Sequence, residues 1–126
     1  MHRRTFDENG KVTNSHGDYP AAVRQVAAEE KVPLIDLTMM SEIFYNALGK
    51  EKSGAAFKEG DGTHHNNYGS YELAKMIAGW MKSKRFYIAK YLIKSLPPFD
   101  PNKPDAPENF NIPASPMIAE VKPLGS

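Results

Sequence analysis

The sequence predicts an α/β protein of which this chain supplies the C-terminal part. Three observations support this expectation. One short apolar run with β-branched residues, 32–37, stands among segments of helical periodicity; no other run can pair with it; and eight of the ten prolines fall within residues 97–126. A buried strand needs neighbours for its N–H and C=O groups. We therefore expect the completing strands to precede residue 1, a mostly helical body over 1–96 and an extended proline-rich tail over 97–126.

A tight turn and then a helix are expected before the strand. The Asn-Gly pair at residues 9–10 favours a turn in which the glycine takes a positive φ. Pro20 is tolerated in the first turn of a helix, and the alanine-rich residues 21–30 place Val23 and Val26 on one apolar side. Residues 32–37 then form the predicted buried parallel strand.

Two longer helices are expected after the strand. Thr38 is suited to cap the first, and Gly49 to end it in a left-handed conformation. A polar loop over 50–65 precedes a helix over 66–84, and a shorter helical segment follows over 86–95. Aromatic side chains at helical spacing are predicted to lie in the core, among them Phe44, Trp80 and Tyr91.

Composition argues against several classes of function. The chain has 16 Lys and Arg against 15 Asp and Glu, so a net charge of +1 gives no basic surplus that would indicate a nucleic-acid partner. No apolar run approaches the roughly 20 residues that cross a bilayer, so no membrane partner is expected. The absence of cysteine excludes disulfides, thiolate zinc sites and cysteine nucleophiles.

One loop combines titratable side chains at short spacing. It is the run Gly-Asp-Gly-Thr-His-His-Asn-Asn-Tyr-Gly at residues 60–69. Because glycines flank Asp61, its side chain and that of His64 can point the same way from a turn. A carboxylate that accepts the Nδ1 proton of a histidine leaves Nε2 free to take a proton from a nucleophile. An ordinary helix cap followed by a solvated histidine is the alternative.

The neighbours of this pair suggest two further expectations. His65 is expected to face solvent or substrate, because adjacent histidines usually point apart. Tyr68 is a candidate for the mouth of a pocket. A metal site built from Asp61, His64 and His65 lacks an evident fourth ligand, so no metal is predicted.

The segment over 61–75 resembles the last conserved block of the SGNH (GDSL-type) hydrolases, in particular the rhamnogalacturonan acetylesterase-like branch. Its Asp-Gly-Thr-His-His-Asn-Asn-Tyr-Gly run and the Leu-Ala pair that follows have the spacing of that block. Residues 16–20, 32–37 and the proline-rich tail are similar to the same branch, so the resemblance covers nearly the whole chain. It implies the C-terminal part of a flavodoxin-like three-layer domain.

The resemblance also implies roles for individual residues. Asp61 matches the family's catalytic acid and His64 its catalytic base, with His65 and Tyr68 as candidates for substrate binding. No metal or organic cofactor is implied. Arg3 and Arg4 are expected to be a solvated basic pair, with binding of an acidic sugar as the alternative.

The function implied is that of a fragment of a carbohydrate acetylesterase. Such enzymes hydrolyse O-acetyl esters, here of a pectic or xylan-like polysaccharide or oligosaccharide, and the resemblance suggests a secreted or periplasmic location. The family's serine follows a Gly-Asp pair, and none of the serines of this chain does, so the nucleophile and the oxyanion-hole residues are expected to lie outside it. The alternative is a noncatalytic chain that associates with another chain, or with itself, through its unpaired strand edge.

Overall fold

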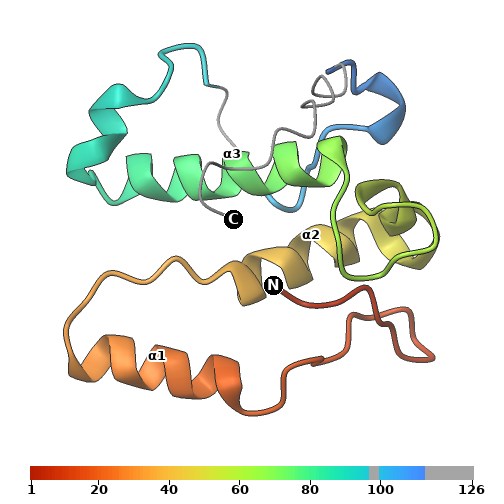
Figure 1. Cartoon of the computed structure of the whole chain (residues 1–126), viewed down its shortest axis with the longest axis horizontal. Coiled ribbons are helices and arrows are strands. Elements are labelled where there is room, and N and C mark those ends of the chain that lie inside the picture. Colours follow the sequence, from red (N-terminus) through yellow and green to blue (C-terminus); the bar gives the residue numbers. More distant parts are fainter. Residues whose placement is uncertain (97–99, 113–126) are drawn as a thin grey trace, which may run out of the picture.

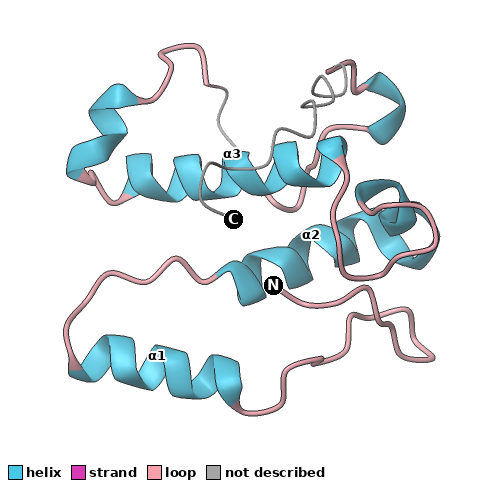
Figure 2. Ribbon diagram, in the orientation of Figure 1, coloured by secondary structure: helices cyan, strands magenta, loops and turns pink. Residues whose placement is uncertain are grey.

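The computed structural model describes residues 1–96 and 100–112, and its regular elements are all helical (Figures 1 and 2). The order is α1 (Tyr19–Glu29), α2 (Leu37–Lys52), η1 (Ser53–Ala56), α3 (Asn67–Ser83), η2 (Tyr87–Tyr91) and η3 (Pro107–Asn109), where η denotes a 3₁₀ helix. Figure 1 shows α2 between α1 and α3. Within these described ranges, no helix is long and apolar enough to cross a membrane.

The predicted strand over 32–37 is wrong for this chain. Residues 32–36 form neither a helix nor a strand, and α2 already begins at Leu37. In the part of the chain that the structure describes, β pairing is limited to two isolated bridges, Phe6 with Val12 and Phe57 with His65. Pairing requires a second strand, and none of the described residues supplies one. The flavodoxin-like sheet therefore remains a prediction.

α1 forms where it was expected, but its apolar side is not covered. Pro20 lies in the first turn of the helix, as predicted. Of the helix's residues only Ala27 is buried, whereas Val23 and Val26 are each more than half exposed. Packing on a partner layer normally covers such a face.

α2 begins and bends at residues that differ in part from those predicted. Its N-cap is Asp36, not Thr38: the Asp36 carboxylate accepts a hydrogen bond from the Met39 N–H at 2.9 Å and also pairs with Arg24 at 2.6 Å. Gly49 takes the predicted positive φ, 77°, and breaks the helix there. The chain then makes a further turn that leads into η1, so the first part of the predicted loop over 50–65 is helical.

The core lies between α2, η1 and the first half of α3. Its ring centroids are closely spaced, with 5.4 Å between Phe44 and Tyr45 and 5.3 Å between Tyr45 and Phe57. The other buried members are Ala56, Tyr68, Leu73 and Met76. These fully buried aromatic rings supply much of the apolar area that stabilises the fold.

The aromatic residues of the predicted core divide into two groups. Phe44 is fully buried, which confirms the prediction for that residue. Trp80 is half-buried against Phe86, with 5.5 Å between the ring centroids. Tyr91 is 72% exposed, so its placement in the core was wrong; the helical segment expected over 86–95 is reduced to η2.

Residues 100–112 pack against α3. The Tyr68 hydroxyl donates a hydrogen bond to the Asp105 carbonyl at 2.7 Å, and the Phe110 ring lies 5.5 Å from that of Tyr68. Lys75 lies between two carboxylates, 2.8 Å from Glu72 and 2.7 Å from Asp105. The remainder of the proline-rich tail, residues 97–99 and 113–126, lies outside the described residues.

Candidate active site

One asparagine connects the end of the loop that precedes α3 to both α3 and η1. The Asn66 side chain caps α3 by accepting a hydrogen bond from the Gly69 N–H at 3.1 Å. Its amide nitrogen donates to the carbonyls of Ala55 and Phe57, at 2.8 and 3.0 Å. Asn66 thus joins α3 to η1 and fixes the direction from which the loop enters the helix. Helical periodicity placed the start of the helix at residue 66 but did not predict the role of this side chain.

α3 and η1 approach so closely that one position has room only for glycine. A Cβ atom added at Gly69 would lie 2.1 Å from the Ala56 carbonyl oxygen and 2.9 Å from the His65 ring. Neither contact is possible without movement of the backbone. The absence of a side chain at this residue therefore determines how closely the loop is drawn onto the core.

The side chains of Asp61 and His64 make the contact that their spacing predicted. Asp61 Oδ2 lies 2.6 Å from His64 Nδ1, and Asp61 Oδ1 accepts the backbone N–H groups of Thr63 and His64 at 2.6 and 3.0 Å. Three hydrogen bonds therefore hold the carboxylate in one orientation. With Asp61 accepting at Nδ1, the neutral imidazole leaves Nε2 unprotonated and able to accept a proton.

The two members of this pair differ in their exposure. The His64 side chain is 78% exposed and that of Asp61 is 28% exposed, so the imidazole is the more open of the two to solvent. Among the residues that the structure describes, none hydrogen-bonds to His64 Nε2. His64 also lines a shallow hollow of about 500 Å³, together with Ser70, Leu73 and Ile77 of α3.

The hydrogen bonds to Asp61 stabilise its ionised form. The side-chain hydrogen bond with His64, followed by the backbone N–H groups of His64 and Thr63, lowers the pKa of Asp61 from 3.8 to about 2. At neutral pH this residue is therefore a carboxylate.

We expect this depressed pKa to be measurable in the chain itself. Because the folded pKa lies below the unfolded one, ionised Asp61 favours the folded state above about pH 4, and this contribution falls away as the pH decreases toward 2. Carbon-detected NMR titration should give an Asp61 pKa of about 2. In His64→Ala the pKa should rise toward 3.8, and an unchanged value would contradict the contact between the two side chains.

His65 is half-buried: its ring packs toward the core, and it also lines the hollow beside His64. Its Nε2 shares a hydrogen bond of 2.6 Å with the Tyr45 hydroxyl, and its ring centroid lies 4.4 Å from that of Phe57. Burial lowers the pKa of His65 and raises that of Tyr45, so both are neutral at pH 7. Adjacent side chains of an extended segment point to opposite sides, which explains why His64 points outward and His65 inward.

Tyr68 is also placed differently from expectation. It is 4% exposed and packs against Phe44 and Phe110, and its hydroxyl donates a hydrogen bond to the Asp105 carbonyl. It therefore supports the core beneath α3 and does not border the hollow beside His64.

Arg4 is a supporting residue whose place the sequence did not reveal. Its guanidinium donates to the Lys50 carbonyl at 2.5 Å and to the Ser53 hydroxyl at 3.0 Å, so it is not merely solvated. Its backbone N–H donates to the Gly62 carbonyl at 2.8 Å. Arg4 thereby connects the end of α2 to the loop that bears Asp61.

The described residues offer no group suited to bind a metal ion, since no three His, Asp or Glu side chains converge. Of the serines near the pair, Ser70 is exposed beside the hollow in the first turn of α3, and Ser53 is buried beneath Arg4. Neither follows a Gly-Asp pair.

Comparison with known proteins identifies partial relatives. The chain is 36% identical over 91 residues to rhamnogalacturonan acetylesterase RhgT of Bacillus subtilis (strain 168), covering 62% of this chain and 39% of that protein. It is 37% identical over 91 residues to the probable rhamnogalacturonan acetylesterase YesY of the same organism, covering 69% and 42%. The uncharacterized esterase YxiM, also from that organism, is 33% identical over 77 residues, covering 61% and 20%.

No protein-family model matches the chain, and no solved structure matches it significantly. The three relatives are esterases by name, which confirms the resemblance noted in the sequence. The chain spans about two fifths of the length of the first two relatives.

Proposed function

We propose, from the premise that this chain is homologous to part of the rhamnogalacturonan acetylesterase-like SGNH hydrolases, that Asp61 and His64 are the acid and base of a serine carbohydrate esterase. The main support is the 2.6 Å contact between Asp61 Oδ2 and His64 Nδ1, with the imidazole exposed at a hollow. The nucleophilic serine is contributed by polypeptide outside this chain.

In this mechanism the proton moves through His64 in each half-reaction. As the serine oxygen attacks the acetyl carbonyl carbon, Nε2 takes the hydroxyl proton, and the imidazolium then gives that proton to the departing sugar oxygen. Water next attacks the acetyl-serine while Nε2 takes a proton from it, and acetate leaves as the serine oxygen is reprotonated. Asp61 holds the ring and stabilises the imidazolium in both steps. The names of the relatives support acetylated rhamnogalacturonan as the substrate class.

A chimeric enzyme tests this proposal. This chain replaces the matching segment of the Bacillus subtilis rhamnogalacturonan acetylesterase, and acetate release from acetylated rhamnogalacturonan is measured. We expect the chimera to release acetate and to react with a fluorophosphonate serine probe. This chain alone should not release acetate and should not be labelled by the probe. Labelling of the chain alone would show that it contains its own nucleophile.

A second candidate function, association through residues 32–36, is favoured by a separate observation. Among the described residues, the N–H groups of Leu34, Ile35 and Asp36 find no acceptor. A hollow of about 310 Å³ separates this segment from Val23 and Tyr19 of α1, so unpaired backbone lies beside exposed apolar side chains. Unpaired backbone of this kind can pair with a strand of another chain.

If this segment pairs with a second copy, the chain should have a solution mass above its 14.0 kDa monomer mass in light scattering. Leu34→Lys should restore the monomer, because a charge on an edge strand opposes pairing. Ile88→Lys, at an exposed apolar residue of η2, is the matched control and should not change the mass. A wild-type monomer at high concentration would exclude self-association through this segment.

A further inference from the structure

The near-neutral charge of the whole chain conceals one strongly basic region. Residues 73–99 contain six of the 16 basic side chains and none of the 15 acidic ones, so the remainder of the chain is net acidic. Lys75 is buried and paired with Glu72 and Asp105. The other five, at the end of α3 and around η2, are Lys82, Lys84, Arg85, Lys90 and Lys94. In the described part of the chain, none of these five forms an ion pair with a carboxylate.

Exposed aromatic rings lie within this basic region. Tyr87 is 76% and Tyr91 72% exposed, which is unusual for large side chains that have apolar faces. The Lys90 ammonium lies between them, 3.8 Å from the Tyr87 centroid and 4.9 Å from the Tyr91 centroid. Two open rings therefore flank one cation. We call Tyr87, Lys90 and Tyr91 the η2 patch.

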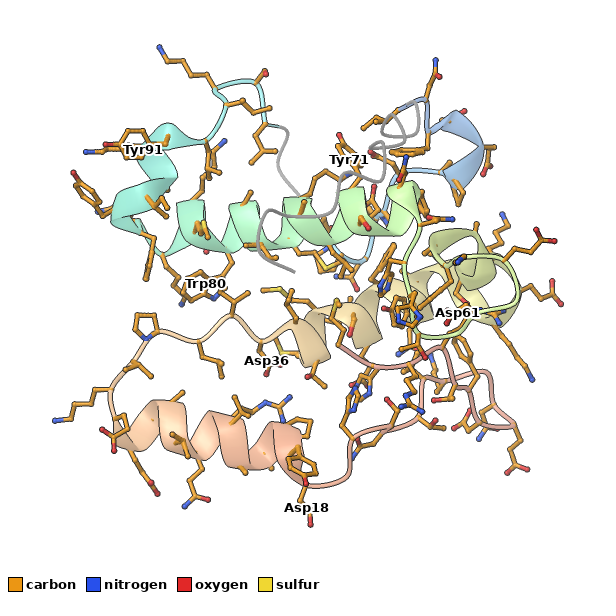
Figure 3. All side chains as sticks on the ribbon, viewed as in Figure 1. Asp18, Asp36, Asp61, Tyr71, Trp80 and Tyr91 are labelled. Carbon is orange, nitrogen blue, oxygen red and sulfur yellow. The ribbon has the colours of Figure 1, made fainter. Side chains whose placement is uncertain are left out.

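The η2 patch lies far from the acid–base pair. Figure 3 shows Tyr91 and Asp61 at opposite ends of the molecule, with α3 extending between their two regions. The 17 residues of α3 span about 25 Å at the usual helical rise. A ligand that contacts both regions at once must therefore be a polymer.

From this arrangement we infer that the η2 patch binds uronate residues of an acidic polysaccharide, at a distance from the site of ester cleavage. The inference rests on the proposed function, which supplies the substrate class. Tyrosine rings offer apolar faces for the C–H face of a sugar ring, and the hydroxyl of each remains available to hydrogen-bond. The ammonium between the rings pairs with the uronate carboxylate, and the surrounding cations attract the rest of the polyanion.

Binding is measured with this chain by isothermal titration calorimetry, using polygalacturonate at several salt concentrations. This polymer carries no acetyl ester, so the result is independent of catalysis and of the chimera experiment. We expect binding to polygalacturonate and none to its fully methyl-esterified form, which keeps the sugar rings but lacks the carboxylates. Equal binding of the two polymers would overturn the inference.

Matched variants locate the site. Tyr87→Ala combined with Tyr91→Ala should weaken binding on the order of tenfold, and Lys90→Met should weaken it and reduce its salt dependence. Tyr19→Ala and Lys11→Met alter exposed residues elsewhere and should bind like the wild type. Unchanged affinity of the patch variants would contradict the inference. So would tighter binding to single-stranded DNA or to anionic lipid vesicles, which would indicate another class of polyanion.

Discussion

His64→Ala in the chimeric esterase is expected to lower kcat for acetate release by about 10⁴-fold or more, with little change in KM. The imidazole is the only proton acceptor in the proposed mechanism, and its loss leaves the serine hydroxyl without a base. Because the His64 side chain is largely exposed, its removal should leave the unfolding temperature nearly unchanged. Initial rates and thermal unfolding of both proteins are the measurements.

Asp61→Asn is a second variant that tests the same mechanism. It preserves the shape of the side chain but not its charge, so His64 is no longer held in the tautomer that frees Nε2. We expect a loss of about 10⁴-fold in kcat. If the His64→Ala chimera kept a kcat within tenfold of that of the unsubstituted chimera, His64 would not be the base. The proposed role of Asp61 as its partner would then also be wrong.

Lys75→Met is expected to destabilise the chain by about 3–5 kcal/mol. The Lys75 side chain is 5% exposed and that of Glu72 is fully buried, so the substitution leaves a buried carboxylate without its cation. Asp105, the second carboxylate beside Lys75, also loses its partner. Urea unfolding followed by circular dichroism measures the change.

The pH dependence of Lys75→Met should identify the cause. Burial raises the pKa of Glu72 in the folded protein, and loss of Lys75 removes the contacts that oppose this rise. With a folded pKa above the unfolded one, stability decreases as the pH rises through the unfolded value of about 4.5. The variant should therefore be more stable at pH 4 than at pH 7. The double variant Glu72→Leu/Lys75→Met, which removes both charges, should recover most of the lost unfolding free energy. If it does not, the destabilisation comes from lost packing and not from the unpaired carboxylate.

Local sequence patterns predicted the helices well because their determinants lie within a few residues. The alanine-rich run predicted α1, and the helical periodicity over 66–84 predicted α3. The Asp61–His64 contact was predictable for the same reason, since one turn contains both side chains and the backbone N–H groups that hold the carboxylate.

Nonlocal features were not predictable in this way. Residues 32–37 have the composition of a strand, but pairing depends on a partner that no local pattern reveals. The inward placement of His65 depends on the Tyr45 hydroxyl, 20 residues away, and the role of Arg4 on the carbonyl of Lys50. The whole-chain charge also obscured the basic region around η2, because an average does not report where charges lie.

The short separation of Asp61 and His64 has a consequence for how the site forms during folding. Closing a contact between residues three apart costs little chain entropy, whereas bringing in a distant segment costs more and proceeds more slowly. The acid and base can therefore adopt their geometry as soon as the turn over 61–64 closes, before long-range contacts are complete. In an esterase that contains this turn, we expect activity to appear during folding only when the segment bearing the serine packs beside the turn, because the Asp61–His64 contact forms earlier.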